Sequence, residues 1–336
     1  MFSLIFDLEE ERLKAEISKR KAKRVLIQLP EGLKPVGPRL AEIVEEAGAL
    51  PIVSADPCYG ACDIAISEAK NLKADLIIHY GHTEAVKAKI PTVYVEARAK
   101  VDVSKILEKA LENLSPWSRI GIATTVQHIH MLDVARKILT KAGKTVIIGD
   151  AGHVKYPGQV VGCDYSNAEA IADDVEAFLF IGGGKFHAIG LALATMKPII
   201  AVDPFENRIH PIADDVKRIL KQRFMCISEA KEAESFGVLV GLKIGQINMK
   251  AAMRIREYLK EDGKKVTMLA IREITPESLM EFPSIDAYIN TACPRVAIDD
   301  ASRFHKPILT TNEALVMLGK ISWETLLNKG WFKHFI

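Results

Sequence analysis

The chain repeats one order of elements three times, and this repeat limits the fold more than any other feature. In each copy a short apolar strand leads into a helical pattern, which ends in a glycine before a second apolar strand. The first strands are expected at 25–29, 120–124 and 238–242, and the glycines are Gly48, Gly143 and Gly263. Glycine readily adopts the left-handed conformation that closes many helices, so these glycines predict helix ends.

Each copy contains two further strands rich in β-branched residues. They are expected at 74–79, 177–181 and 287–290, and then at 92–97, 198–204 and 307–311. Strands separated by helices pair in parallel, because a parallel return needs a long crossover. We therefore predict an α/β fold of three doubly wound modules, each with a roughly four-stranded parallel sheet flanked by helices, at 1–100, 101–225 and 226–336. One large α/β sheet is the alternative.

The charge balance and the first residues exclude several classes of partner. Lys and Arg number 45 against 43 Asp and Glu, so charge alone gives no reason to expect nucleic acid or an acidic membrane surface. The first 24 residues hold one short apolar cluster among charged residues, which is typical of neither a signal peptide nor a membrane-spanning helix. We expect a cytoplasmic protein.

Three of the five cysteines occupy related places in the repeat. Aligning the first two copies sets GACD (60–63) beside VGCD (161–164), so Cys62 and Cys163 are equivalent. In the third copy the third strand runs directly into Cys293. Each module thus offers one thiol just beyond the carboxyl end of a strand, where open parallel sheets bind ligands.

The other two cysteines fit this pattern less well. Cys58 has no counterpart in the second copy, and Cys226 lies between apolar neighbours, as a buried structural cysteine does. The spacing of Cys58 and Cys62 matches the first part of the CxxxCxxC pattern of radical S-adenosylmethionine enzymes, but position 65 is Ala65, so that match fails. An odd number of cysteines also argues against a disulfide framework.

The residue types favour an iron-sulfur cluster. Cys62 and Cys163 are both expected to precede helices, and the helix dipole lowers the pKa of a thiol there and favours the thiolate. Three thiolates without a fourth equivalent suit a 4Fe-4S cluster with one open iron better than a structural zinc ion, which takes four protein ligands.

Six segments in the same order resemble one enzyme family. They are YGACD (59–63), TTVQHIH (124–130), YPGQVVGCDYS (156–166), IGGGKFHAIGLALAT (181–195), AVDP (201–204) and ACPRV with Asp299 and Asp300 (292–300). Between about residues 20 and 320 the chain is similar to the archaeal diphthamide synthase subunit family, the 2-(3-amino-3-carboxypropyl)histidine synthases. This resemblance implies a homodimer in which each chain holds a 4Fe-4S cluster on Cys62, Cys163 and Cys293.

The resemblance also implies the reaction. S-adenosylmethionine would bind at the fourth iron, and its 3-amino-3-carboxypropyl group would pass by radical chemistry to an imidazole carbon of one histidine of translation elongation factor 2. The low-potential electron would come from an external donor. This transfer is the first step of diphthamide biosynthesis.

Several further residues are candidate contacts for S-adenosylmethionine. Glycines after the third strand of the second copy let backbone approach a ligand, and polar side chains follow the first strand; these candidates are Gly182, Gly183, Gly184, Gln127, His128, His130, His187 and Asp203. Arg295 is expected to pair with the methionine carboxylate through its guanidinium fork. A tight turn, a core histidine and a salt bridge are the respective alternatives.

Two other functions follow the same cysteine pattern. Quinolinate synthase and the diphosphate reductase of isoprenoid synthesis also resemble three-module chains with a three-cysteine cluster, where the open iron acts as a Lewis acid or reductant on a small molecule. A zinc-stabilised binding scaffold is the alternative without catalysis.

Overall fold

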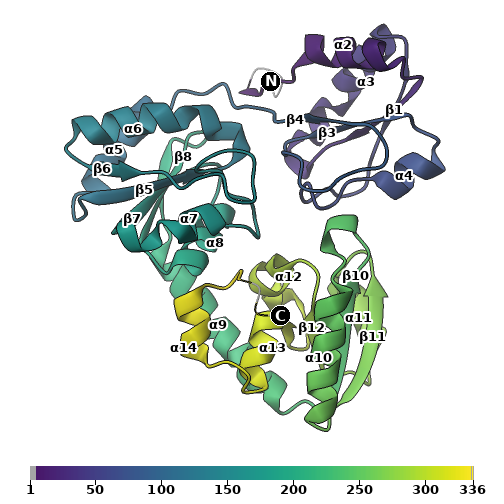
Figure 1. The fold of residues 1–336 in the computed structure, drawn as a ribbon, viewed down its shortest axis with the longest axis vertical. Helices are drawn as coiled ribbons and strands as arrows, with labels where there is room; N and C mark the ends of the chain where they lie inside the picture. Colours follow the sequence, from purple (N-terminus) through teal and green to yellow (C-terminus); the bar gives the residue numbers. More distant parts are fainter. Residues whose placement is uncertain (1–4, 334, 336) are drawn as a thin grey trace.

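The computed structural model describes residues 5–333 and 335, which form three lobes, each built around one sheet (Figure 1). The strand orders are β2-β1-β3-β4, β6-β5-β7-β8-β9 and β11-β10-β12-β13. In every lobe the first strand lies between the second and the third, so the lobes repeat one topology. The predicted α/β class with three helix-flanked parallel sheets is confirmed, and one large sheet is excluded.

The first lobe has a wholly parallel sheet. Its strands are β1 (Arg24–Gln28), β2 (Leu50–Val53), β3 (Leu76–Tyr80) and β4 (Thr92–Val95). Its helices are α2 (Glu10–Arg20), the 3-10 helix η1 (Glu31–Val36), α3 (Gly37–Glu46) and α4 (Ile66–Asn71). The apolar faces of α2 and α3 bury Leu13 and Leu40 in one core, and the loop and helix around α4 form a smaller one.

The second lobe adds a fifth strand that runs antiparallel to its neighbour. Its strands are β5 (Arg119–Thr124), β6 (Thr145–Ile147), β7 (Ala177–Ile181), β8 (Ile199–Asp203) and β9 (Arg208–Pro211). Its helices are α5 (Ser104–Asn113), η2 (Val126–Met131), α6 (Leu132–Lys141), α7 (Ser166–Ala170), η3 (Ala172–Asp174) and α8 (Phe186–Thr195). The sheet is therefore larger than predicted, because the tight turn after Asp203 returns the chain as a hairpin.

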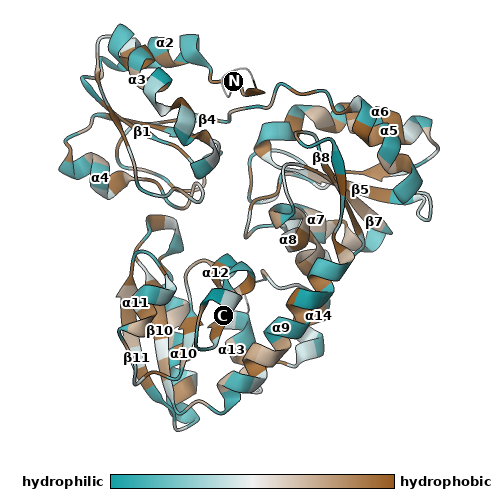
Figure 2. Ribbon diagram, turned by 180° about the vertical axis from the view of Figure 1, so that it is seen from behind, coloured by the Kyte–Doolittle hydropathy of each residue, from teal (hydrophilic) through white to brown (hydrophobic). Residues whose placement is uncertain are grey.

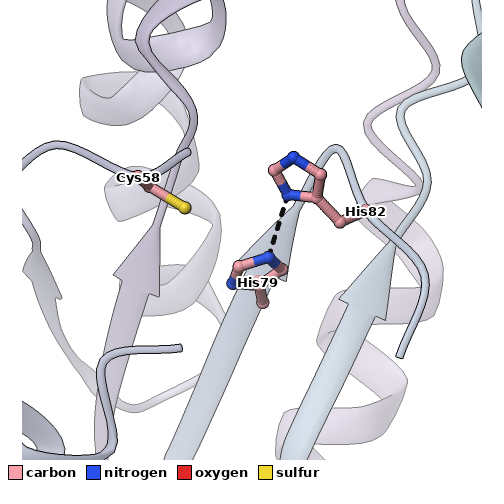
Figure 3. A group of neighbouring side chains, drawn as sticks. All are labelled: Cys58, His79 and His82. Carbon is pink, nitrogen blue, oxygen red and sulfur yellow. Dashed lines mark hydrogen bonds between the residues drawn. The ribbon is translucent and has the colours of Figure 1, made fainter. Parts of the chain in front are cut away.

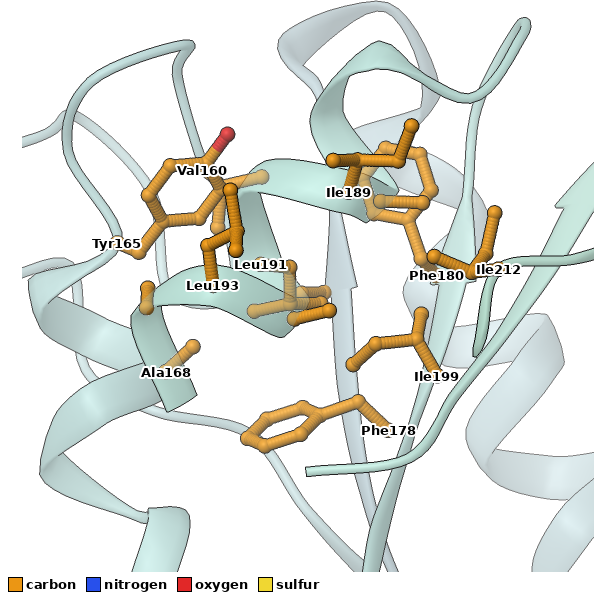
Figure 4. Packing of buried hydrophobic residues seen from close by; sticks show 14 of the residues in the cluster. Val160, Tyr165, Ala168, Phe178, Phe180, Ile189, Leu191, Leu193, Ile199 and Ile212 are labelled. Carbon is orange, nitrogen blue, oxygen red and sulfur yellow. The ribbon is translucent and has the colours of Figure 1, made fainter. Parts of the chain in front are cut away.

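Helix α8 lies against the second sheet with almost its whole surface covered. Its sequence FHAIGLALAT is apolar on every side, and the residues from 188 to 194 are buried. Figure 4 shows Leu191 of this helix among Phe178, Phe180 and Ile199 of the sheet, and Leu193 beside Tyr165 and Val160. A sheet covered on both faces has continuous apolar strands, which explains why AFLFI (177–181) lacks alternation.

The third lobe again has four parallel strands. They are β10 (Ser235–Gly241), β11 (Lys265–Ile271), β12 (Ala287–Asn290) and β13 (Ile308–Thr310). The helices are η4 (Ile244–Gln246), α10 (Met249–Glu261), α11 (Pro276–Met280), α12 (Pro294–Asp299), η5 (Ala301–Arg303) and α13 (Thr311–Met317). Figure 2 shows hydrophobic residues along β10 and a mixture of hydrophilic and hydrophobic residues on the helices of this lobe.

Two helices link the second and third lobes. Helix α9 (Ala213–Lys231) leads from one sheet to the other, and α14 (Trp323–Lys329) brings the chain back. Leu326 and Trp331 are buried in the core of the second lobe, so the last turns do not belong to one lobe alone. The predicted boundary at residue 225 falls inside α9, and the division at 1–100, 101–225 and 226–336 stays a prediction.

The three predicted helix-ending glycines are confirmed. Gly48, Gly143 and Gly263 have φ values of 83°, 81° and 76°, the left-handed region that side chains disfavour. Each follows its helix directly and turns the chain into the second strand of its lobe. Over the described residues, no helix has the length and apolar composition needed to cross a membrane.

Candidate metal centre

Cys62 lies in the loop between β2 and α4, where two lobes hold its backbone. Within the first lobe, the Gln28 side chain donates to the carbonyl of Asp63 over 2.6 Å. From the third lobe, the backbone N–H of Gly245 donates to the Cys62 carbonyl over 2.8 Å, and Gln246 Nε2 lies 3.4 Å from the Cys62 sulfur. The loop is thus fixed by the segment that follows β10.

Cys163 and Cys293 follow strands of the other two lobes. Cys163 lies between β6 and α7, in a turn closed by the bridge from Val161 to Asp164. Cys293 follows β12 and is the N-cap residue of α12. The Asn290 side chain donates to the Cys293 carbonyl over 2.7 Å, so the end of the strand determines where this cysteine lies.

The structure places the three predicted thiols close enough to influence one another's pKa. Burial raises the pKa of Cys163 to about 12, although its side chain reaches solvent, and the nearby Cys293 and Cys62 raise it further. Burial also raises the pKa of Cys293, and Cys62 adds to that shift. Three sheets therefore contribute one thiol each to a common site.

The expected lowering of the thiol pKa by helix dipoles is wrong for Cys62 and Cys163. Cys62 lies four residues before α4 and Cys163 three residues before α7, and those helices have only 6 and 5 residues. Burial raises the pKa of the Cys62 thiol as well. Burying a thiolate away from water is unfavourable, and a short helix that begins three or four residues away stabilises the negative charge too little to offset this. The thiols therefore stay protonated until a metal cation replaces the protons.

At least one pair among the three sulfur atoms lies farther apart than two ligands of one ion would. Two sulfurs about 2.3 Å from one zinc ion lie at most about 4.6 Å apart. Among the described residues, Cys62, Cys163 and Cys293 do not belong to any group whose ligand atoms all lie within 4.8 Å of one another. A single zinc ion held by all three thiols does not fit this arrangement, whereas a multi-iron cluster binds each thiolate to a different iron.

Lys243 is a buried cation beside this site that sequence reasoning missed. It lies two residues after the end of β10, is 5% exposed, and contacts Asp63 at 3.0 Å and Glu273 at 2.7 Å. Its charge acts to lower the pKa of the Cys62 thiol, against burial. A lysine at the carboxyl end of a strand was visible in the sequence, but its partner Asp63 lies 180 residues away.

Arg295 forms a second buried link between lobes. Its Nη2 donates to the Phe186 carbonyl and to Asp299, both over 2.8 Å, and its guanidinium lies 3.8 Å from the centre of the Phe186 ring. The structure therefore pairs Arg295 with protein groups: its salt bridge to Asp299 lies within α12, and its hydrogen bond to the Phe186 carbonyl joins the lobes. Its Nη1 has no partner among the described residues, and contact with a substrate carboxylate stays a prediction.

The glycines at 182–184 have a structural explanation. Gly184 has φ +66° and donates its N–H to Asp203 over 2.7 Å, while a Cβ at Gly182 would meet the Phe180 ring at 2.8 Å. Asp203 also accepts the N–H groups of Phe205 and Glu206. The Asp203 carboxylate thus organises this edge of the sheet.

The polar residues predicted as contacts after β5 make different interactions in the structure. The Gln127 side chain donates to the Gly81 carbonyl over 2.6 Å and joins the first two lobes. His128 is 1% exposed beside the Phe205 ring, and burial lowers its pKa to about 4. Burial lowers the pKa of His130 as well.

His187 lies near charged or titratable residues of the other two lobes. Burial lowers its pKa to about 3, and the neighbouring Arg295 and His82 lower it further. It therefore stands between residues of all three lobes. Contact of any of these residues with S-adenosylmethionine stays a prediction.

Comparisons with known proteins all identify the same family. The family described as "Putative diphthamide synthesis protein" matches residues 29–327. A 2-(3-amino-3-carboxypropyl)histidine synthase of Pyrococcus horikoshii is 37% identical over 319 residues, which cover 94% of this chain and 92% of that protein. Subunit 1 of the same synthase in Schizosaccharomyces pombe is 31% identical and covers 91% of this chain and 72% of that protein.

The fold agrees with a solved structure. Dph2 from Pyrococcus horikoshii, crystallised with a 4Fe-4S cluster, superposes with a TM-score of 0.87 at 36% identity, and the match covers 95% of this chain and 92% of that one. The chain therefore belongs to the diphthamide synthesis family of 2-(3-amino-3-carboxypropyl)histidine synthases.

Proposed function

We propose that this protein transfers the 3-amino-3-carboxypropyl group of S-adenosylmethionine to an imidazole carbon of one histidine in translation elongation factor 2, the first step of diphthamide biosynthesis. The observation that carries the proposal is the convergence of one cysteine from each of three sheets. Membership of the synthase family supports the reaction. The proposal includes a homodimer and an external electron donor.

Cys62, Cys163 and Cys293 would hold a 4Fe-4S cluster. The chemistry that this group supplies when bound is one electron, which breaks the bond between the sulfonium sulfur and the methionine γ-carbon. Lys243 and Arg295 place two cationic groups beside the thiols, and their charges favour thiolates there. Each cation also joins two lobes, so thiol spacing and local charge depend on the same contacts.

The remaining site residues would orient the substrate. His187 is the best supported of them, because it neighbours Arg295 and His82. Gly182, Gly183, Gly184, Gln127 and His128 remain in the proposal as weaker contacts, since each already has a packing or hydrogen-bonding use. The match to the 2-(3-amino-3-carboxypropyl)histidine synthases supports this reaction over the Lewis-acid chemistry of a quinolinate-synthase-like enzyme.

Incubating the reduced protein anaerobically with S-adenosylmethionine tests the reaction. We expect methylthioadenosine in the absence of elongation factor 2, and an added 3-amino-3-carboxypropyl mass on one histidine when the factor is present. A chain with an intact cluster that releases no methylthioadenosine would contradict the proposal. Formation of 5'-deoxyadenosine instead would show that a different bond of the sulfonium is broken.

The contact between the first and third lobes predicts a sensitive glycine. A Cβ at Gly245 would lie 2.6 Å from the Cys62 Cα, so Gly245→Ala has to displace the loop. Overpacking of this kind costs about 1–3 kcal/mol. We expect a clear loss of iron per chain after anaerobic reconstitution. Gly32→Ala is the matched control, because a Cβ there meets nothing within 4 Å; equal iron in both variants would contradict the role of this contact.

A further inference from the structure

A second group of metal-ligating side chains lies in the first lobe. Cys58, His79 and His82 each offer one ligand atom, and these atoms all lie within 4.8 Å of one another. Figure 3 shows the Cys58 sulfur pointing toward the two imidazole rings. Cys58 and His79 are 2% and 0% exposed, and His82 is half-buried. None of the three belongs to the set of Cys62, Cys163 and Cys293.

The group occupies the place where parallel sheets bind ligands. Strand β1 pairs with β2 on one side and β3 on the other, so the chain changes direction across the sheet at this point. Gln28 is the last residue of β1, and its paired residue on β3 is His79. Cys58 follows β2, and His82 follows β3. Ligands of open α/β sheets bind beyond the carboxyl ends of strands at such a switch point.

Gln28 determines which nitrogen of His79 is free to bind. The Gln28 Nε2 donates to the Asp63 carbonyl over 2.6 Å, so the amide oxygen faces the other way and accepts the Ala65 N–H over 3.0 Å. That same oxygen lies 2.9 Å from His79 Nδ1, which must therefore carry the proton. The lone pair of His79 is thus on Nε2.

The lone pair of His79 Nε2 faces His82. His79 Nε2 lies 3.0 Å from His82 Nδ1. When His82 Nδ1 carries a proton, this contact is a hydrogen bond; when a cation takes the place of that proton, both nitrogens become ligands. The change needs the proton of His82 to move to Nε2 and the thiol proton of Cys58 to leave for solvent, so binding releases one proton.

We infer that Cys58, His79 and His82 bind one divalent cation of the zinc type, separate from the three-thiol site. One thiolate with two imidazoles suits zinc rather than magnesium or calcium, which prefer oxygen ligands. No fourth His, Cys, Asp or Glu joins this group among the described residues, so water would complete a tetrahedron. Gln28 joins His79 to the backbone of Asp63, so the ion would steady the Cys62 loop.

Cobalt is a suitable probe, because a thiolate bound to Co²⁺ gives a charge-transfer absorption. The full-length chain carrying Cys62→Ala, Cys163→Ala and Cys293→Ala removes competing thiols at the other site. Anaerobic titration should load about one cobalt ion per chain, with the thiolate band. Adding Cys58→Ser should abolish the band, whereas adding Cys226→Ser, in another lobe, should leave it unchanged. Gln28→Ala should weaken binding about 10- to 100-fold.

Two further measurements test the inference even if the triple variant folds poorly. Circular dichroism establishes whether each variant folds, and zinc analysis of the wild-type chain with its cluster should show about one zinc ion, lost in His82→Gln and Cys58→Ser while iron remains. A folded triple variant whose thiolate band survives Cys58→Ser, or a wild-type chain that binds no zinc or cobalt, would overturn the inference. S-adenosylmethionine enters none of these assays, so the outcome is independent of the proposed reaction.

Discussion

Chains with Cys62→Ala, Cys163→Ala or Cys293→Ala are expected to hold no 4Fe-4S cluster after anaerobic reconstitution, while Cys58→Ala keeps it. The pKa of Cys163 is raised by both Cys62 and Cys293, so each lobe places one of these thiols near the other two, and loss of one should leave an iron without its ligand. Methylthioadenosine formation should fall by more than the roughly 10- to 100-fold that follows loss of an outer-shell partner.

Iron and sulfide analysis with visible absorption of the same samples checks this prediction. Cys226→Ala is the matched control, since this cysteine lies on α9 beside Arg223, away from the site. Cys58→Ala is the sharper comparison, because it lies four residues from Cys62 in one loop. If Cys58→Ala loses iron and Cys62→Ala retains it, the ligand assignment is reversed.

Removing Arg223 is expected to give the largest loss of stability. Arg223 and Glu313 are both fully buried, with Nε and Nη2 of Arg223 at 2.6 and 2.8 Å from the two carboxylate oxygens. Arg223 also donates to the Ile308 carbonyl over 2.7 Å. Arg223→Met would leave the buried Glu313 carboxylate without an opposite charge, which destabilises a protein by about 3–5 kcal/mol.

The effect should be local to the junction of α9 and α13. Because a three-lobed chain need not unfold in one step, amide hydrogen exchange in these two helices is the appropriate measurement. Arg218→Ala on the same helix is the control: its ion pair with Asp215 is exposed, so the change should stay within about 0.5 kcal/mol. Exchange in α13 that is equally fast in both variants would contradict the prediction.

A double variant separates the two roles of Glu313. Its carboxylate also accepts the Thr310 N–H over 2.7 Å, which caps α13. Replacing a buried ion pair by apolar residues of similar volume is often neutral, so Arg223→Met with Glu313→Leu should recover most of the loss. The remainder should be about 1 kcal/mol, the usual value of a helix cap.

Much of the fold could be read from local sequence patterns. The strands predicted at 177–181 and 287–290 agree with the structure to the residue, because buried parallel strands are continuous apolar runs with clear ends. The strand predicted at 74–79 lies at Leu76–Tyr80, so it begins two residues later and ends one residue later than predicted. The fifth strand β9 was missed because RIHP carries no such run.

The candidate site was predictable only where the repeat reached it. Cys62 and Cys163 were related by alignment of two copies, and Cys293 by its place after a strand. The pKa direction of the thiols was predicted wrongly, because burial depends on which lobes close over a loop. Lys243 and the group of Cys58, His79 and His82 were missed for the same reason, since their partners lie on other strands or lobes.

The sequence by itself determined the three-sheet architecture and one thiol for each sheet. Both follow from interactions between residues close in the chain: strand runs, helix-ending glycines and short loops. Only the tertiary structure decided that Gly245 and Lys243 hold the Cys62 loop, that Arg295 is paired within the protein, and that Cys58 lies beside two histidines. These contacts join residues far apart in sequence, and side-chain burial and pairing exist only once the lobes have packed together.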